Sequence, residues 1–501
     1  MYLNCIKPKS HIFAIVLYTI IYIFFPTNNS TIDAYNYAAN VKWGHDLFFP
    51  HHLLYNLPAW LIHSLFQTFY FDLDVLQLMK TINAIAAGLV LFVFFKILKQ
   101  LSVQKNTITA LLLVAGSSFG FFRFATENEA YIIPLLMSVI SSYYFLLFVN
   151  KKLNQYILVS GFFASMACLF HQIHVFWFIG IFIGLISFKY KTKPLVFFLL
   201  PGFLIPVVYF LAFRFGNNEF IKADNLLIYV LYDYFYGTAN VEFSFDNIIL
   251  GFINLIRSYV QVHGIILILI KKYVFLIIVI LLSGFFFIKA LLSLKSIQKN
   301  KQLNRNFLLV HVIIFILQFA FAIFAGGNAE FMVMLPILSL FVAITYVELN
   351  NTFYKNLGIA ILIWNMSFAV LPNYIFDYKN NKQIINYIET KTKHYFILSE
   401  DVLIQNKIYY QTGIPWNGYI LKSPAGNKIN GKNLSELSLQ IDSLLKQNKT
   451  IYTDCIDEPV VFNRAAYLSA NENNLFFKNY HNIKVDSFQT FAGTKYINVI
   501  K

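Results

Sequence analysis

The chain has 501 residues, of which 58% are hydrophobic and only 13% are charged, whereas a soluble domain contains roughly 25% charged residues. This composition excludes an ordinary soluble protein and predicts a protein that crosses a membrane many times. The net charge of +15 does not indicate a nucleic-acid-binding protein, because the basic residues lie in short clusters between apolar runs and form no single basic module. The three cysteines lie at the N-terminus, inside an apolar run and near the C-terminus, which predicts neither a disulfide nor a cysteine metal site.

Eleven apolar runs predict transmembrane helices, since a helix is the only single segment that satisfies its own backbone hydrogen bonds in lipid. The first run follows Lys7 and Lys9 but precedes no small-residue cleavage site, so we expect a retained span rather than a signal peptide. The predicted spans are residues 11–26, 79–98, 107–122, 130–149, 154–170, 173–188, 194–213, 273–292, 306–325, 331–348 and 355–372.

The basic residues of the short loops predict the orientation of these spans, because Lys and Arg favour the cytoplasmic side. Every second loop is basic, whereas the loops of opposite parity carry acids, His, Asn and Gly with a single Arg. This alternation predicts a multi-pass protein of the cell inner (plasma) membrane with a cytoplasmic N-terminus and an extracytoplasmic C-terminus. Lys271 and Lys272 do not fit the pattern. The basic loop residues that define it are Lys99, Lys105, Lys151, Lys152, Lys189, Lys191, Lys193, Lys295, Lys299, Lys301, Arg305 and Lys355.

Two long segments are expected on the outer side. The first, residues 27–80, contains an aromatic and amphipathic stretch over residues 48–71 that suits a helix at the membrane interface. The second, residues 214–272, mixes Tyr and Phe with acids and should lie at the same interface.

The composition changes after residue 372, where Asn, Lys, Asp and Glu become frequent. Strands at Tyr395–Leu398 and Thr450–Tyr452 and a helix at Leu434–Gln447 are expected there, which predicts a small soluble α/β domain over residues 373–501. The aromatic segment Tyr409–Tyr419, with Trp416, offers either stacking surfaces for sugar rings or the core of this domain. The spans before it form a transmembrane domain over residues 1–372.

Asp33 is the first candidate for a catalytic residue. It follows the first span closely, and a carboxylate at the membrane surface could take a proton from a hydroxyl group of an acceptor. The alternative is that Asp33 caps a helix that begins at Ala34. His51 and His52, farther along the same segment, are candidates for substrate binding.

The loop between the third and fourth spans brings together one base and two acids. Arg123, Glu127 and Glu129 could bind a divalent metal or an acceptor, or the acids could simply hold the arginine. His171 and His174 have the spacing of one helical turn and are a further weak candidate for metal binding, although a histidine at a span junction can also be a solvated cap.

These residues resemble the pattern of the GT-C membrane glycosyltransferases, which include the protein mannosyltransferases and the aminoarabinose transferases of lipid A. The resemblance covers the predicted spans and implies a helical polytopic fold of the GT-C kind. The residues that carry it are Asp33, Tyr37, Gly44, Pro50, His51 and His52 in the first outer segment, and Glu127 to Leu135 in the next outer loop.

The resemblance implies an inverting transfer of a sugar from a polyprenyl-phosphate donor to an extracytoplasmic glycan, lipid or protein. By position, Asp33 would be the general base or orient the acceptor, and Glu127 or Glu129 would be the second acidic site. The chain departs from the pattern at Ala34, where many members have a second acid, and at Glu330, near which many members have a basic residue.

A lipid-linked donor requires a cation for its phosphate on the outer side. Arg123, Arg214 and Arg257 are the available residues, and Arg257 is expected on a helical face that could close over a donor. The alternative for Arg257 is an arginine that extends to the membrane interface.

Two other functions remain open at this point. A secondary transporter usually carries ionisable or helix-breaking residues at mid-membrane in repeated halves, whereas the acids here lie in outer loops and no repeat is visible. A membrane polysaccharide polymerase or ligase would use the same donors but has its large outer loop late in the chain. A scaffold without chemistry does not explain two outer loops in which acids, histidines and aromatics converge.

Overall fold

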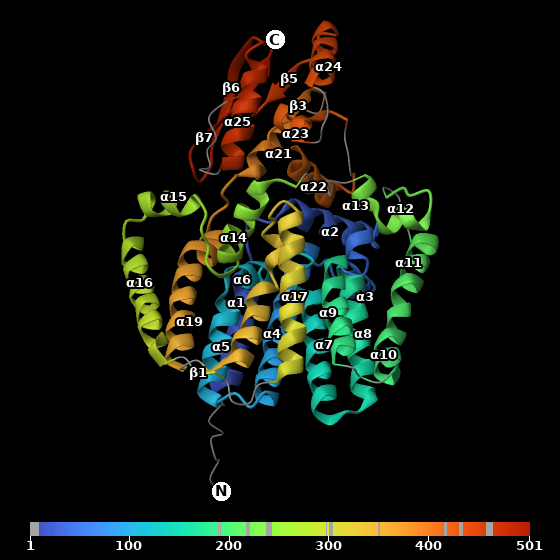
Figure 1. Cartoon of the computed structure of the whole chain (residues 1–501). Helices are drawn as coiled ribbons and strands as arrows, with labels where there is room; N and C mark the ends of the chain where they lie inside the picture. The colour runs from blue at the N-terminus through green and yellow to red at the C-terminus, as the bar shows by residue number, and fades with distance from the viewer. Residues whose placement is uncertain are drawn as a thin grey trace. The chain divides into compact units, whose positions relative to one another are not determined.

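The computed structural model of the chain is shown in Figure 1. It describes residues 10–188, 190, 192–216, 221–236, 243–296, 298–299, 304–348, 351–391, 393–414, 418–429, 434–456 and 464–501. Several residues considered above lie outside these ranges, namely the N-terminal cysteine Cys5 together with Lys7, Lys9, Lys189, Lys191, Lys301 and Trp416.

The chain divides into two compact units. The bundle unit comprises Met1–Pro26, Gly44–Gln261 and Phe275–Leu371. The sheet unit comprises Thr27–Trp43, Val262–Val274 and Pro372–Lys501. The last boundary, between Leu371 and Pro372, falls next to the predicted one at residue 372, but two short segments from the outer loops belong with the C-terminal part.

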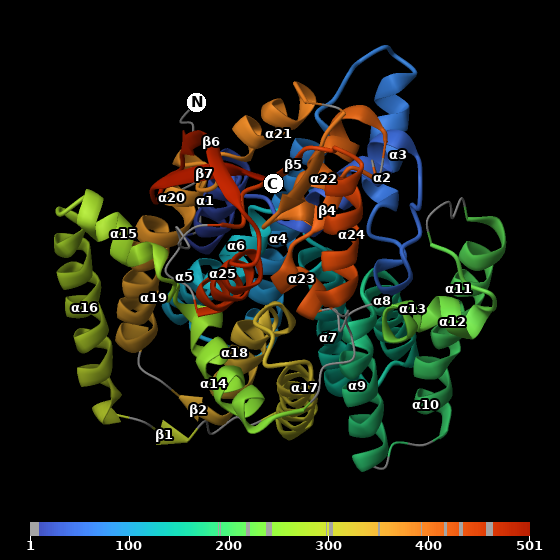
Figure 2. The same ribbon diagram turned by 90° about the horizontal axis from the view of Figure 1, so that it is seen from above.

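The bundle unit consists of helices that run side by side (Figure 1), with α10 and α11 next to α8 and α9 at one end and α16 next to α19 at the other (Figure 2). Its helices up to the second outer segment are α1 (Ser10–Phe24), η1 (Pro50–His52), α3 (Leu57–Gln67), α4 (Val75–Gln100), α5 (Lys105–Ser117), α6 (Phe119–Ala125), α7 (Ile132–Lys151), α8 (Asn154–Phe170), η2 (Gln172–His174), α9 (Val175–Ser187), α10 (Thr192–Leu199), η3 (Leu200–Phe203) and α11 (Leu204–Phe215).

The rest of the unit contains the second outer segment and the late spans. Two short strands, β1 (Gln298–Lys299) and β2 (Val347–Glu348), pair antiparallel between late helices. The remaining helices are α12 (Leu226–Val230), α13 (Tyr232–Phe235), α14 (Phe245–Tyr259), α16 (Leu276–Leu292), η4 (Ser293–Ser296), α17 (Arg305–Phe324), η5 (Glu330–Met332), α18 (Leu335–Tyr346), α19 (Asn351–Asn365), the π-helical turn η6 (Met366–Val370) and α20 (Leu371–Ile375), whose last residues join the sheet unit.

The described helices agree in position with the predicted spans, and each predicted run overlaps at least one of them. Five helices in the described residues are long and apolar enough to cross a membrane, or six if a bent pair counts as one span. The other predicted spans correspond to apolar helices of 10–17 residues. The long helices are Val75–Gln100, Ile132–Lys151, Thr192–Phe215, Arg305–Phe324 and Asn351–Ile375.

The third predicted span, residues 107–122, is not a single straight helix. The chain bends by 67° between α5 and α6, because Ser118 is extended, with φ −57° and ψ 132°. The Ser118 hydroxyl donates to the carbonyl of Val114 at 2.8 Å, a contact that favours bends in helices. The Ser117 carbonyl, freed at the break, accepts a hydrogen bond from Nδ2 of Asn365 at 2.7 Å, so the bend leaves this backbone group paired.

The sheet unit contains a five-stranded mixed sheet in the order β4-β3-β5-β7-β6. Strand β3 is parallel to β4 and β5, and β7 is antiparallel to β5 and β6. Its strands are β3 (Tyr395–Leu398), β4 (Ile420–Lys422), β5 (Ile451–Thr453), β6 (Asn482–Gln489) and β7 (Thr494–Ile500). Its helices are α2 (Ile32–Trp43), α15 (Ile265–Lys272), α21 (Asn381–Glu389), α22 (Asp401–Thr412), α23 (Pro424–Ile429), α24 (Leu434–Lys446) and α25 (Arg464–Phe477).

Alternate residues of β3 point to opposite faces of this sheet, as a strand requires. Phe396 and Leu398 belong to one buried cluster, with residues of α21 and α22, and Ile397 belongs to a second cluster with residues of α24 and α25. The sheet therefore has helices on both faces. The predicted α/β character, the strands near residues 395 and 451 and the helix near residue 434 are confirmed.

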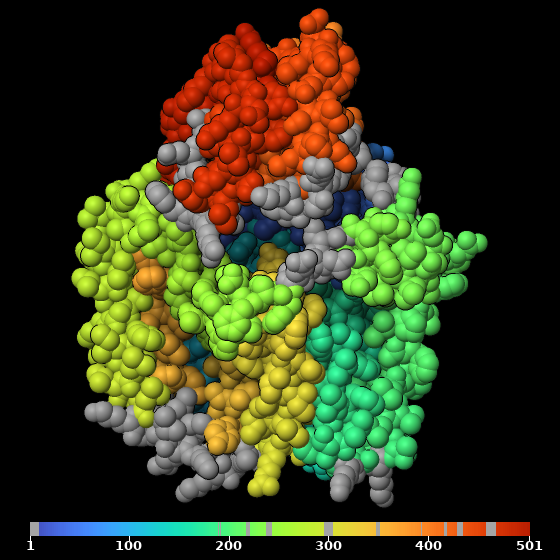
Figure 3. Space-filling model, turned by 45° about the horizontal axis from the view of Figure 1, so that its top comes forward, coloured from blue at the N-terminus to red at the C-terminus, as the bar shows by residue number. Residues whose placement is uncertain are grey.

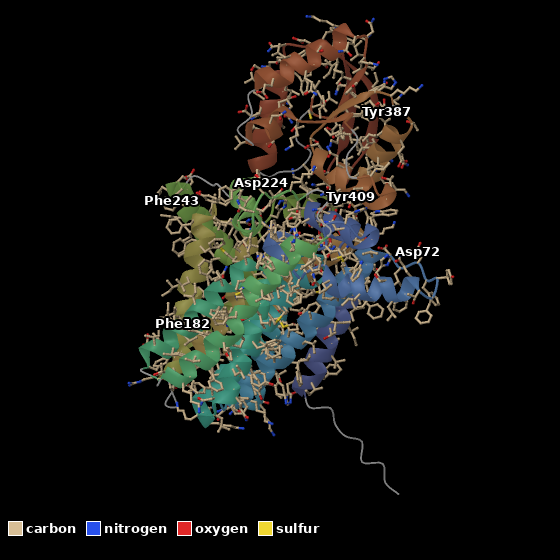
Figure 4. All side chains as sticks on the ribbon, turned by 90° about the vertical axis from the view of Figure 1, so that its right-hand side faces the viewer. Asp72, Phe182, Asp224, Phe243, Tyr387 and Tyr409 are labelled. Carbon is tan, nitrogen blue, oxygen red and sulfur yellow. The ribbon has the colours of Figure 1, made fainter. Side chains whose placement is uncertain are left out.

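Helix α2 packs on α22 within the sheet unit. Tyr409, labelled in Figure 4, donates to Oδ1 of Asn40 at 3.2 Å and is 3% exposed. The Trp43 indole N–H donates to the Tyr409 carbonyl at 3.1 Å, and a Cβ on Gly413, at φ +75°, would lie 3.1 Å from the Trp43 ring. Tyr409 is thus part of the core and is not a stacking surface for sugars.

The two lysines that break the charge pattern lie on α15 of the sheet unit. The Lys272 ammonium donates to the carbonyl of Phe491 and lies 4.2 Å from the centre of the Phe491 ring. This contact explains why a lysine occurs at position 272 without placing that segment in a cytoplasmic loop.

Candidate functional site

The loop between α6 and α7 buries both predicted acids. Glu127 is 1% exposed, Asn128 is fully buried and Glu129 is 3% exposed. A single amide fixes this loop: Nδ2 of Asn83, on α4, donates to the carbonyls of Glu127 and Glu129 at 2.8 and 2.9 Å. These acids are therefore part of the packed interior.

Tyr55 completes the support of the loop. Its hydroxyl donates to Oδ1 of Asn128 at 2.7 Å and accepts from Nδ2 of Asn83 at 3.1 Å. Burial, followed by the charge of Glu129, raises the pKa of Tyr55 well above its ordinary value, so this hydroxyl stays protonated and keeps donating. The backbone N–H of Asn128 donates to Oε1 of Glu127 at 2.9 Å.

Lys80 lies one turn before Asn83 on the same helix and is only 5% exposed. Its ammonium is near enough to Glu127 for the two charges to interact. Lys80, Asn83 and Tyr55 were not identified from the sequence. The available signal was a lysine and an asparagine in the first turns of an apolar run, where polar groups are costly unless they are paired.

Arg123 and Arg257 lie on two helices of the bundle unit that pack against each other, α6 and α14. Arg123 lies on α6, with its guanidinium 5.3 Å from the centre of the Phe124 ring, and Arg257 lies on α14. Burial, followed by the positive charge of Arg123, lowers the pKa of Arg257. Nη1 of Arg257 donates to Oδ1 of Asn254 at 3.1 Å, whereas its buried Nε has no hydrogen-bond partner.

No described carboxylate forms an ion pair with either arginine. The interpretation in which Glu127 and Glu129 simply hold Arg123 is therefore wrong. Two neighbouring guanidinium groups without an acid between them form an arrangement suited to an anion, and paired arginines suit the oxygens of a phosphate.

The four predicted histidines gather in the bundle unit. The rings of His51 and His52 lie 4.1 Å apart, as do those of His52 and His171, and His171 lies 6.3 Å from His174. Nδ1 of His51 contacts Oδ2 of Asp233 on α13, and Nδ1 of His174 is 2.7 Å from the Ser138 hydroxyl. The set thus joins the first outer segment to the junction of α8 and α9.

His171 and His174 are 5% and 1% exposed, so neither is a solvated cap. Burial, followed by the neighbouring histidines, holds the pKa of His52 and of His171 well below the ordinary value. Nε2 of His171 and Nε2 of His174 are buried without a hydrogen-bond partner in the described chain. Within these ranges no group of three or more His, Cys, Asp or Glu side chains is arranged to hold a metal ion; metal binding by Glu127, Glu129, His171 or His174 stays a prediction.

Glu330, the position at which the chain departs from the GT-C pattern, accepts a hydrogen bond from the Tyr131 hydroxyl at 3.2 Å. The Tyr131 ring lies 5.2 Å from that of His171. Tyr131 thus connects the end of the acidic loop to both Glu330 and the histidines.

Asp33 belongs to the sheet unit, whereas the other predicted site residues belong to the bundle unit. It is exposed in the first turn of α2, which begins at Ile32. The Thr31 hydroxyl accepts the backbone N–H of Ala34 at 3.1 Å, so Thr31 makes the side-chain cap expected of Asp33. A carboxylate in the first turn is favoured by the helix dipole and is accessible to a substrate.

No family model and no curated protein sequence matches this chain. Solved structures are similar to it over nearly its whole length. Among them is the Archaeoglobus fulgidus oligosaccharyltransferase in complex with Zn and sulfate, with 14% identity, coverage of 97% of this chain and 72% of that chain, and a TM-score of 0.47. Another is ArnT from Cupriavidus metallidurans in the apo state, with 10% identity, coverage of 97% of both chains and a TM-score of 0.43.

The same ArnT bound to undecaprenyl phosphate is similar at 9% identity, with coverage of 98% of this chain and 97% of that chain and a TM-score of 0.40. The resemblance to GT-C membrane glycosyltransferases is thus found again as a distant likeness of fold. At these identities and TM-scores it carries no argument about residues or activity, which must come from the side chains of this chain.

Proposed function

We propose that this chain is an integral membrane glycosyltransferase that transfers a sugar from a polyprenyl-phosphate donor to an extracytoplasmic acceptor, with inversion. The observation that carries the proposal is the pair Arg123 and Arg257, two neighbouring guanidinium groups without a described acid partner. Such a pair is costly in a partly buried position unless an anion binds between them.

The surroundings of Arg257 favour an anion that is attached to a lipid. Helix α14 carries exposed apolar side chains beside this arginine, including Phe252 at 55% and Ile256 at 62% exposure. Figure 3 shows the side chains of α14 at the surface next to those of α17. A free anion needs no such apolar surface, whereas a polyprenyl phosphate presents a charged head and an apolar tail together.

In the proposed reaction the acceptor oxygen attacks the anomeric carbon from the face opposite the phosphate. The bond between that carbon and the phosphate oxygen breaks, polyprenyl phosphate leaves with the bonding electrons, and the acceptor proton passes to the Asp33 carboxylate. One displacement of this kind inverts the anomeric centre. Arg123 and Arg257 would stabilise the leaving phosphate, and Glu127 and Glu129 would position the acceptor or a divalent metal.

The proposal includes eleven membrane crossings, a cytoplasmic N-terminus and an extracytoplasmic C-terminus. Reporter fusions at Lys152 and Lys501 test the orientation. An export-dependent reporter should be silent at Lys152 and active at Lys501, and the reverse result would overturn it.

The activity is tested with purified protein and a panel of polyprenyl-phosphate sugars. Turnover with at least one donor is expected, with Arg257→Gln defective in donor binding and Arg214→Gln, at an exposed arginine, unaffected. A protein that neither binds nor turns over any polyprenyl-phosphate sugar, but moves an unmodified solute across reconstituted vesicles, would be a transporter. A product extended by many sugar units from one acceptor would indicate a polymerase.

A further inference from the structure

The parallel strands of the sheet unit end in polar residues that come together. Strand β3 is followed by Ser399, β4 ends at Lys422, and β5 is followed by Asp454. The Ser399 backbone N–H donates to Oδ1 of Asp454 at 2.7 Å, and its hydroxyl donates to Oδ2 at 3.1 Å. The carboxyl ends of β3 and β5 are thus joined by direct side-chain contacts.

This edge is the point at which the strand order reverses. From β3 the chain passes through α22 to β4 on one side, and then returns past β3 to β5 on the other side. In open α/β sheets, ligands bind outside the carboxyl ends of the strands at such a reversal. The topology therefore places Ser399 and Asp454 where a binding site is expected.

Lys495, on β7, completes the cluster as a binding group rather than a base. Its ammonium pairs with Asp454 and donates to the Ser399 hydroxyl at 2.9 Å. Burial lowers the pKa of Lys495, but the carboxylates of Asp454 and Glu400 together outweigh burial and raise that pKa above its ordinary value. A lysine kept protonated cannot take the proton of Ser399, so Lys495 is not the base of a nucleophilic serine.

Two further side chains of α22 carry hydrogen-bonding atoms that the protein leaves unused. Asp401 and Gln405, one turn apart on this helix, are 7% and 8% exposed. Oδ2 of Asp401 and Nε2 of Gln405 are buried and have no hydrogen-bond partner in the described chain. Asp401 begins α22 only two residues after Ser399, and the charges of Lys422 and Asp454 both act on it, so Asp401 lies next to the same edge of the sheet. Buried polar atoms are rarely left unpaired without a ligand or a functional reason.

The charges of the cluster indicate a neutral, hydroxyl-rich ligand. Each acid has a basic neighbour: Asp454 has Lys495, Asp401 has Lys422, and Glu400 pairs with Lys379. The N-terminus of α22, where a phosphate would otherwise bind, is taken up by Glu400 and Asp401. The unused groups are one acceptor and one donor, which together match the hydroxyl groups of a sugar ring.

We infer that the carboxyl edge of β3 and β5 is a carbohydrate-binding site, in which Asp401 accepts from sugar hydroxyls and Gln405 donates to a ring or hydroxyl oxygen. Ser399 is exposed and Lys495 is 20% exposed, so the edge reaches solvent beside the buried Asp401 and Gln405. Identifying this carbohydrate with the acceptor of the transferase rests on the proposed function; binding itself does not.

The test is saturation-transfer NMR of the full chain with the methyl glycosides of mannose, glucose, galactose and N-acetylglucosamine, in a detergent without a sugar headgroup. Transfer to at least one glycoside is expected. Asp401→Asn should weaken it about tenfold or more, the scale of losing a hydrogen bond to a charged group. Glu436→Gln, at an exposed acid of α24, is the matched control and should bind like wild type.

Several outcomes would overturn the inference: no transfer from any of the four glycosides, Asp401→Asn binding like wild type, or equal losses in Glu436→Gln. Gln405→Leu, which keeps a similar volume, provides a second variant if Asp401→Asn fails to fold. Because this readout is binding, a failure here leaves turnover of lipid-linked donors unaffected, and a failure of the transferase activity leaves glycoside binding in place.

Discussion

Arg257 of α14 lies close enough to Arg123 of α6 for the charge of Arg123 to lower the pKa of Arg257. Because like charges repel each other, an anion bound beside both guanidinium groups would relieve this repulsion. Replacing one of the two arginines is therefore expected to leave the stability of the protein unchanged or higher and to weaken its binding of a phosphate.

Arg123→Gln should leave the thermal midpoint of the ligand-free protein unchanged or higher, while it weakens the affinity for polyprenyl phosphate roughly 10- to 100-fold. The measurement is the rise of the thermal midpoint with added polyprenyl phosphate. Arg214→Gln should respond to the lipid like wild type. A lower midpoint together with an unchanged response would mean that Arg123 is only structural.

Asn83 and Tyr55 are expected to act through the acidic loop. Tyr55→Phe removes the hydrogen bond to Asn128 and should cost about 1 kcal/mol of stability, with loss of transferase activity beyond that expected from stability. Tyr22→Phe is a matched control, because its buried hydroxyl also makes a hydrogen bond of 2.7 Å, to the Gly116 carbonyl. If both variants lose stability and activity to the same extent, Tyr55 has no positioning role.

The eleven apolar runs could be found in the sequence because hydropathy acts over many consecutive residues. The bend at Ser118 could not be found in this way. It depends on Asn365 and Tyr22, which lie far away in the chain and donate hydrogen bonds to the carbonyls of Ser117 and Gly116 next to the bend. The same is true of Thr27–Trp43 and Val262–Val274: each looks like part of an outer loop, and only tertiary contacts assign it to the sheet unit.

Part of the candidate site could be predicted from charged residues that lie close together in the sequence. Two acids and an arginine in a short loop indicated a site, but the sequence could not tell that Arg123 would meet Arg257 rather than Glu127. His171 and His174 were expected at the surface because their span junction is polar, whereas the first outer segment covers them with His52.

Asp33 and Thr31 can now be separated by mutation. Thr31→Ala removes the observed cap and should cost about 1 kcal/mol of stability with turnover retained. Asp33→Asn leaves the cap in place and should keep stability and donor binding, while transfer falls roughly 10²- to 10⁴-fold. The transfer rates of the two purified variants are measured with a donor that supports turnover by the wild type. Wild-type turnover by Asp33→Asn would shift the catalytic assignment to Glu127 or Glu129.

The buried histidines predict that stability falls in mild acid. The pKa values of His52 and His171 lie well below the ordinary value in the folded chain, so the unfolded chain binds more protons as the pH decreases. Their contribution is therefore fully present above the unfolded pKa of about 6.5 and is lost progressively below it. The thermal midpoint, measured from pH 8 to pH 5, should decrease below about pH 6.5. His171→Gln should flatten this decrease, whereas His481→Gln, at an exposed histidine of the sheet unit, should leave it unchanged; a wild-type slope in His171→Gln would show that the buried histidines do not control it.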